Sequence, residues 1–156
     1  MPTSLDELRK QMEAGHSTGL NLQWKASEHA DGFDLRIETE RYTNRYGEHR
    51  LFGHVGMIGE GWAVSVSAPS AFHVKAGQEE DVSRFCLDHQ MEKPLVRFGL
   101  DESDGELRPS VHLVLGDEGL DNLRLSLMIL LLVGACEDLA SVLPGAGPVF
   151  HDREGE

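Results

Sequence analysis

The chain has 156 residues, with 14 lysines and arginines against 27 aspartates and glutamates, so its formal charge is −13. Apolar residues make up 40% and charged residues 26%, which is typical of a globular domain and excludes a disordered chain. The acidic excess argues against a general nucleic-acid or membrane-surface binder, because both classes need basic residues to meet phosphate. Cys86 and Cys136 are too few for a disulfide scaffold and no signal peptide opens the chain, so we expect a cytoplasmic protein.

The first segment predicts a short helix. Ser4 and Glu7 have the spacing of a capping box, which satisfies two unpaired backbone N–H groups. Leu8 and Met12 fall on one face of this helix, and Gly15 is a suitable end.

Four patterns of alternating apolar and polar residues come next and predict an antiparallel meander. A turn at Asp31-Gly32 joins the first two strands, and Gly59-Glu60-Gly61 joins the last two. In the fourth strand we expect Trp62, Val64 and Val66 to face the same way. The four strands are expected at 20–24, 33–37, 50–58 and 62–68.

The middle of the chain predicts a second helix and a two-stranded hairpin. The helix is expected over 78–92, and its inner stripe at i, i+3, i+4, i+7 consists of Val82, Phe85, Cys86 and His89. The hairpin strands are expected at 96–100 and 111–115, around the turn Asp104-Gly105. Because Pro109 has no backbone N–H, we expect the start of the last strand to be irregular or at an edge.

A long helix is expected from about Asp121, its N-cap, to Leu143. Its first turns are apolar on every side, and a helix of that kind must be covered on every side. One sheet face does not suffice, so we expect a second copy of the chain to supply the other cover. The expected dimer interface consists of Leu123, Leu127, Leu130 and Leu131.

Domain organisation follows from where these patterns stop. After Pro144 no periodic pattern continues. We therefore expect a single α+β domain over residues 1–143 and a flexible C-terminal tail over 144–156.

No motif in the sequence carries catalytic chemistry. The glycines between Gly53 and Gly61 lie within and between two strands, whereas a phosphate loop needs them at a strand-to-helix turn. Cys86 and His89 share a helix face but supply at most half of a zinc site, so a packed thiol beside a half-buried imidazole is favoured. We expect no catalytic residue, no cofactor and no metal site.

One segment departs from the acidic composition. Between Arg41 and Arg50, three arginines and one glutamate give a net charge of +2, so the rest of the chain carries −13 − 2 = −15. Both tyrosines of the chain lie in this segment, whose candidate contact residues are Arg41, Tyr42, Arg45, Tyr46 and Arg50. Arginine interleaved with aromatic residues suits single-stranded nucleic acid or a protein contact. A tyrosine-anchored connection whose arginines pair with nearby acids is the third interpretation and is favoured, with nucleic acid last.

The second half of the chain resembles the YbjN family of small bacterial proteins. The resembling segment is PLVRFGLDESDGELRPSVHLVLGDEGLDNLRLSLMILLLVGACEDLASVLP: a strand ending in FGLD, an acidic glycine turn, an apolar strand and a leucine-rich helix. The first half agrees in the order of its elements, so the resemblance covers about residues 4 to 143. It implies an α+β fold similar to type III secretion chaperones, which are acidic, non-enzymatic, dimeric proteins that hold a partner polypeptide.

Together these features predict a non-enzymatic homodimer of the bacterial cytosol that binds other proteins as a chaperone or adaptor. The strongly anionic exterior suits a basic protein partner. The alternative is an accessory nucleic-acid-binding protein that acts through residues 41–50, which the surrounding negative charge disfavours.

Overall fold

The structure is a computed structural model that describes residues 4–15, 24–28, 32–44, 46–69, 71–74, 77–92, 95–101, 103–115, 119–142 and 149–150. Its helices are α1 (Leu5–Gly15), α2 (Glu79–Gln90) and α3 (Asn122–Val142), and η1 (Gly59–Gly61) is a 3₁₀ turn. Its strands are β1 (Trp24–Glu28), β2 (Gly32–Glu38), β3 (Arg50–Ile58), β4 (Ala63–Ser67), β5 (Phe72–Val74), β6 (Arg97–Asp101), β7 (Glu106–Val114) and β8 (Val149–Phe150).

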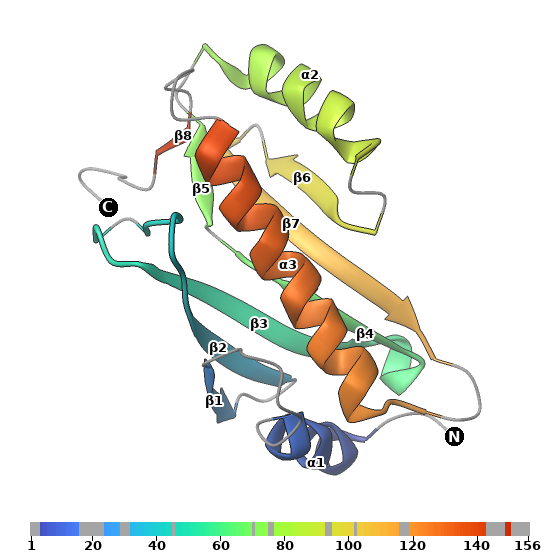
Figure 1. Cartoon of the computed structure of the whole chain (residues 1–156). Coiled ribbons are helices and arrows are strands. Elements are labelled where there is room, and N and C mark those ends of the chain that lie inside the picture. Colours follow the sequence, from blue (N-terminus) through green and yellow to red (C-terminus); the bar gives the residue numbers. More distant parts are fainter. Residues whose placement is uncertain are drawn as a thin grey trace.

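The strands form one 8-stranded antiparallel sheet, and α3 runs diagonally across one of its faces (Figure 1). β1 to β4 pair in sequence order as the expected meander, with Leu35 opposite Gly53 and Val55 opposite Val66. The expected α+β order of helix, meander, helix, hairpin and long helix is therefore confirmed. The strand expected over 20–24 is described only from Trp24, because residues 16–23 lie outside the described part of the chain.

The strand β7 lies in the interior of the sheet, and β4, β5 and β6 all pair with it. Ser110 on β7 pairs with Ser67 on one side and with Arg97 on the other, so β4 and β6 flank β7. The short strand β5, which the sequence patterns did not predict, pairs with β7 beyond the end of β4. β4 and β5 therefore follow β7 as one interrupted strand.

The expectation that Pro109 lies at an irregular or edge position is wrong. Pro109 is buried inside β7, opposite Phe98 on β6, and its carbonyl accepts a hydrogen bond from the N–H of Ala68 at 3.0 Å. In an antiparallel strand the N and C=O of one residue point to the same side. The missing N–H of Pro109 therefore points at the interruption between β4 and β5, where no strand carbonyl requires it.

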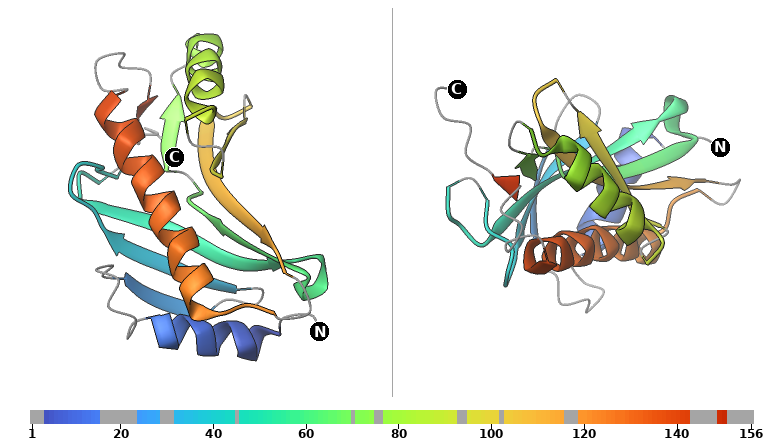
Figure 2. Two further views of the ribbon diagram at one scale, coloured as in Figure 1. Left: turned by 45° about the vertical axis from the view of Figure 1, so that its right-hand side comes forward. Right: turned by 90° about the horizontal axis from the view of Figure 1, so that it is seen from above.

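The core lies between α3 and the sheet face that it covers (Figure 2). Every second residue of the central strands points into it, as in the buried set Phe33, Leu35 and Ile37 of β2. α1 packs against α3 with Leu8 and Met12 buried, and the Ser4 hydroxyl accepts the expected capping hydrogen bond from the N–H of Glu7 at 3.1 Å.

The remaining elements lie at the other end of α3. α2 packs on β6 with Val82 and Cys86 buried and with Phe85 and His89 half-buried, as its inner stripe predicts. Within the expected tail the structure describes only Val149–Phe150, which pairs with β5. No helix of the described residues is long and apolar enough to span a bilayer.

Candidate protein-interaction surfaces

The outer face of α3, which points away from the sheet, carries the four leucines that the sequence predicts as dimer contacts. Each of them has between 39% and 56% of its surface exposed. On the opposite side of the same turns, Leu125, Ile129 and Leu132 are fully buried. Leu123, Leu127, Leu130 and Leu131 follow each other at i, i+4, i+7 and i+8 on one helix face, and we call them the α3 leucine stripe.

An apolar groove continues the α3 leucine stripe toward the segment that joins α2 to β6. It has a volume of about 330 Å³, and Gly134 and Ala135 of α3 line it. Leu95, which is 65% exposed, forms the opposite wall with Val96 and Glu92. Sequence periodicity identified the leucines but missed this groove, because Leu95 is far from α3 in the chain.

A second apolar surface lies where the β3–β4 hairpin meets the end of β7. Ile58, Ala63 and Val114 pair across three strands, so they form one row on the sheet face that α3 does not cover. Val114 is 80% exposed, and Trp62, in the same hairpin, is 49% exposed. Trp62 thus lies at the surface and not among the buried residues of β4, and we call Ile58, Trp62 and Val114 the hairpin patch.

The tip of this hairpin is conformationally strained. Glu60 adopts a left-handed backbone conformation with φ 60° and ψ 31°, between Gly59 and Gly61, whose φ angles are also positive. A residue with a side chain adopts this conformation at a cost, and such strain concentrates at binding sites. Trp62, which directly follows this turn, has a helical backbone conformation with φ −79° and ψ −16° and not that of a strand.

The Arg41–Arg50 segment is anchored by its first tyrosine. Tyr42 is 2% exposed, its hydroxyl donates to the carbonyl of Ala71 at 2.7 Å, and its ring meets Phe72 edge-on at 5.3 Å. Burial raises the pKa of the Tyr42 phenol well above its ordinary value of 10.0. The ring of Tyr42 is therefore part of the core.

The carboxylate of Glu137 on α3 fixes the backbone of the same segment. It accepts hydrogen bonds from the N–H groups of Glu40 at 2.9 Å, Arg41 at 3.0 Å and Tyr42 at 2.5 Å. The guanidinium of Arg41 forms an ion pair with Asp138, the next residue of α3, at 3.6 Å. This loop therefore depends on α3 for its conformation.

The other nominated residues of this segment lie toward solvent. Arg50 pairs with Glu48 at 3.5 Å, and Tyr46 is 70% exposed. Arg45 lies outside the described residues. The structure thus brings Tyr42 into the core and leaves Tyr46 as the exposed aromatic side chain of the described segment.

The groups considered for metal binding are packed side chains. Cys86 is buried, which raises the pKa of its thiol to about 11. The His89 ring stacks on Phe85 with a centroid distance of 5.5 Å, and its Nδ1 lies 3.4 Å from the carboxylate of Glu92. Across the described ranges no three His, Cys, Asp or Glu side chains are placed to hold a metal ion.

The uncovered sheet face also holds a polar hollow of about 460 Å³ between β4, β7 and β6. Serine hydroxyls of Ser65, Ser67 and Ser110 and the side chains of Arg97 and His112 line it. Along β4 and β7 these residues alternate with buried ones, which is the pattern of a solvated antiparallel sheet face.

The fold is similar to two solved structures. No family model matches the sequence, and no curated protein matches it. YbjN from E. coli, described as a candidate transcription regulator, is 11% identical, with a TM-score of 0.67 over 95% of this chain and 96% of YbjN. One chain of the ExsC–ExsE complex is 14% identical, with a TM-score of 0.56 over 92% of this chain and 97% of its own. The YbjN-like fold that the second half of the sequence predicts is therefore confirmed.

Proposed function

We propose that this protein is a non-enzymatic homodimer of the bacterial cytosol that binds other proteins as a chaperone or adaptor. The observation that carries the proposal is the α3 leucine stripe, which leaves four leucines in one line at the surface. Scattered apolar residues are normal on a monomer, whereas a contiguous apolar patch marks an interaction site.

The strength of this contact can be bounded. Full burial of a leucine is worth about 1.5–3 kcal/mol, so covering the exposed part of four half-buried leucines on each of the two copies contributes roughly 6–12 kcal/mol. Association costs about 4–15 kcal/mol in lost motional freedom. The gain and the cost are of similar size, so a neighbouring apolar surface strengthens the dimer, and the groove beside Leu95 supplies one.

Light scattering at micromolar concentration tests the dimer, with two matched variants. Leu127→Asp places a charge in the middle of the α3 leucine stripe, and we expect it to be a folded monomer. Leu87→Asp is the control, because Leu87 is 71% exposed on α2 and lines neither the stripe nor the groove. A monomeric unaltered chain, or equal behaviour of the two variants, contradicts the proposal.

The hairpin patch is our proposed contact for the partner protein. Tryptophan is one of the residue types enriched among binding hot spots. The net charge of −13 favours a basic partner by complementarity and accelerates its association. A structural neighbour that was solved within a protein–protein complex supports a protein-binding role.

Quantitative capture tests this contact. Bacterial lysate is passed over the immobilised protein, and each retained polypeptide is compared between the unaltered chain and two variants. Trp62→Ala is expected to lower retention of the specific partner at least tenfold, whereas Tyr46→Ala, which removes another exposed aromatic ring, is expected to leave it unchanged. Equal retention by all three proteins would place the partner on another surface.

Some of the side chains that the nucleic-acid alternative would use are buried or already paired in this structure. Base stacking needs exposed rings, and the ring of Tyr42 is buried. Arg41 and Arg50 each lie in an ion pair with an acidic side chain. The favoured role of the segment is thus to tie the β2–β3 connection to α3.

A further inference from the structure

The α3 leucine stripe ends at a glycine that no described neighbour in the same chain requires. Gly134 follows Leu130 and Leu131 on the same helix face, in the interior of α3. A Cβ atom added at Gly134 would meet no atom of the described residues within 4 Å, so no described neighbour in the same chain requires a glycine there. Glycine inside a helix destabilises it relative to alanine. A close approach from outside the chain would account for it.

When two copies of the stripe run in opposite directions, a large residue of each copy faces the small residue of the other. In an antiparallel helix pair, residues at equal distances from the two-fold axis face each other. An axis between Leu130 and Leu131 places Leu130 against the partner's Leu131 and Leu127 against the partner's Gly134. A large side chain then meets an open position twice, once on each side of the axis.

We infer, on the basis of the proposed homodimer, that two copies pack α3 against α3 in antiparallel orientation, with Leu127 of each filling the groove beside the partner's Gly134. The groove of about 330 Å³, lined by Leu95, Leu130, Leu131 and Gly134, is the receiving surface. The occupant is thus a second copy of this chain.

A parallel arrangement does not use these features. It would set Leu127 against the partner's Leu127 and Gly134 against the partner's Gly134, which leaves the groove empty.

The antiparallel arrangement also covers Leu95, which lies outside the stripe. An interface of standard size buries about 800 Å² on each partner, more than one line of leucines offers, so the cover over Leu95 is required. At each end of the contact, Leu123 faces the partner's Asp138. The Asp138 side chain is 35% exposed and forms an ion pair with Arg41, so each end of the contact is polar, as expected for the rim of an interface.

Exchanging the large residue at position 127 and the small residue at position 134 tests the antiparallel arrangement. Gly134→Leu fills the groove and is expected to raise the dimer dissociation constant at least tenfold, measured by sedimentation equilibrium. The double variant Leu127→Ala/Gly134→Leu moves the large side chain to the other member of the same pair. We expect it to bind at least tenfold more tightly than Gly134→Leu alone, although it carries one more large-to-small change. Circular dichroism and urea unfolding check that all variants remain folded.

Single cysteines under mild oxidation give a second readout. Leu130→Cys and Leu131→Cys lie next to the axis and are expected to form disulfide-linked dimers. Leu123 is 7.5 residues from the axis, so two copies of Leu123→Cys stand about 22 Å apart along the helices and are expected to remain unlinked. The unaltered chain is the control, because Cys86 and Cys136 are buried.

The outcomes separate this inference from the proposed function. Linkage at 130 and 131 but not at 123, together with rescue by the double variant, supports the antiparallel arrangement. A dimer that also links through 123 overturns it in favour of a parallel one. A dimer that links at none of these positions and is unchanged by Gly134→Leu overturns it while the homodimer stands. A monomeric unaltered chain overturns both.

Discussion

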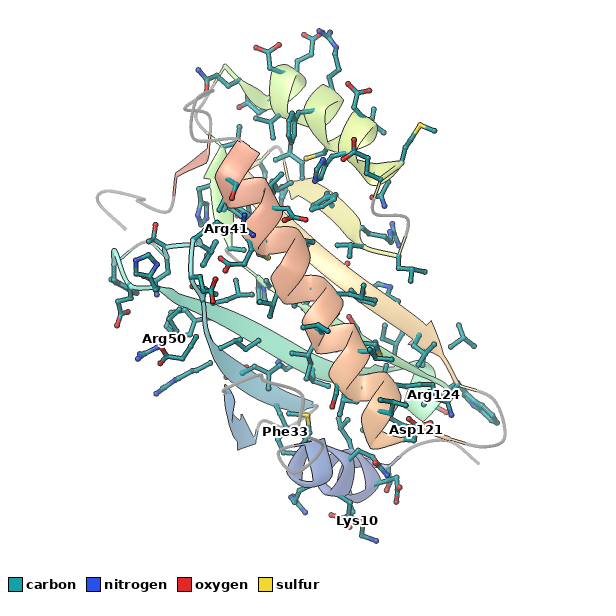
Figure 3. The ribbon with its side chains drawn as sticks, in the orientation of Figure 1. Lys10, Phe33, Arg41, Arg50, Asp121 and Arg124 are labelled. Atoms are coloured by element: carbon teal, nitrogen blue, oxygen red, sulfur yellow. The ribbon has the colours of Figure 1, made fainter. Side chains whose placement is uncertain are left out.

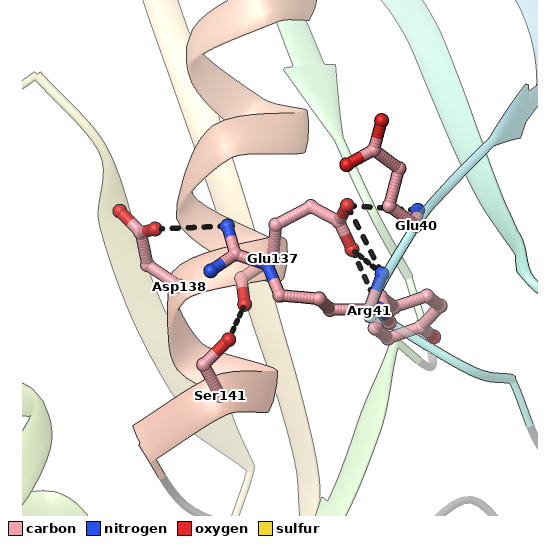
Figure 4. Close-up of polar contacts among 6 residues, drawn as sticks. Glu40, Arg41, Glu137, Asp138 and Ser141 are labelled. Carbon is pink, nitrogen blue, oxygen red and sulfur yellow. Dashed lines mark hydrogen bonds and ion pairs between the residues drawn. The ribbon is translucent and has the colours of Figure 1, made fainter.

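Glu137 and Tyr42, 95 residues apart in the sequence, are joined by a hydrogen bond of 2.5 Å from the backbone N–H of Tyr42 to the carboxylate of Glu137. Together with the N–H groups of Glu40 and Arg41, this contact gives a buried carboxylate three backbone donors (Figure 4). A buried charge is tolerated only when it is paired or hydrogen-bonded in this way. The β2–β3 connection is therefore attached to the same helix that carries the leucine stripe.

Replacing Glu137 by glutamine is expected to destabilise the fold. Glutamine has nearly the same shape, but it keeps one acceptor oxygen and presents an amide donor toward the N–H groups of residues 40–42. Hydrogen bonds to a charged group contribute about 1.5–3 kcal/mol each, so we expect a loss of at least about 2 kcal/mol in the free energy of unfolding. Urea denaturation followed by circular dichroism measures it.

Ser141→Ala is the matched control for Glu137. Its exposed hydroxyl donates to the main-chain carbonyl of Glu137 at 3.0 Å, one turn further along α3. Loss of an exposed hydroxyl changes stability by no more than about 0.5 kcal/mol. Equal unfolding free energies for the glutamine and Ser141→Ala variants would contradict the role assigned to the carboxylate.

The cap of α3 gives a prediction that depends on pH. The Asp121 carboxylate accepts a hydrogen bond from the backbone N–H of Arg124 at 2.8 Å and another from its guanidinium at 2.7 Å (Figure 3). The backbone bond first, and then the side-chain bond, lower the pKa of Asp121 below its ordinary value of 3.8. A lowered pKa stabilises the fold in full above the ordinary value and ceases to do so as the pH falls through the lowered one.

We therefore expect Asp121→Ala to cost about 1 kcal/mol at pH 7, as is usual for an N-cap, and less at an acidic pH below 3.8. Asp121→Asn is the control, since an uncharged amide oxygen caps the helix but cannot titrate. Its effect on the urea midpoint should be small and equal at both pH values. A cost for Asp121→Ala that does not change with pH would show that the negative charge contributes nothing.

The buried phenol predicts a loss of stability in alkaline solution. Burial first, and then the neighbouring thiol of Cys136, raise the pKa of Tyr42 above 10.0. A raised pKa stabilises the fold in full below the ordinary value and is lost as the pH rises through the raised one, so unfolding becomes easier above about pH 10. Tyr42→Phe removes this titration and should flatten the decline between pH 9.5 and 11. Measurements at pH 7 and 8, where the difference between the two chains should be constant, are the control. Parallel declines for both proteins would contradict the assignment.

Local patterns predicted most of the fold. The serine at residue 4 and the aspartate at residue 121 cap their helices because capping depends on three neighbouring residues. The meander followed from alternation, since a strand with one buried face must alternate. The same alternation failed for Trp62, because its backbone is helical and not extended and β4 begins only at Ala63, and its ring is exposed.

Contacts between distant residues could not be predicted in this way. Nothing near Pro109 in the sequence indicates that the strand beside it is interrupted, which is the condition that places a proline inside the sheet. Nothing near Glu137 indicates three backbone donors, and the groove beside Leu95 arises only when the α2–β6 connection meets α3. The sequence thus predicted the leucines of the candidate surface but not the groove beside them.

Fluorescence anisotropy with a labelled single-stranded oligonucleotide tests the remaining role of the Arg41–Arg50 segment. With Tyr42 in the core and Arg41 and Arg50 in ion pairs, we expect no binding at micromolar protein even at 20 mM salt, where phosphate contacts are strongest. A single-stranded DNA-binding protein assayed alongside checks the probe. Binding that weakens steeply with added salt, and that Tyr46→Ala or Arg50→Ala reduces at least tenfold, would establish the nucleic-acid function instead. Binding that neither substitution changes would assign the contact to another surface, such as the polar hollow that contains Arg97 and Arg108.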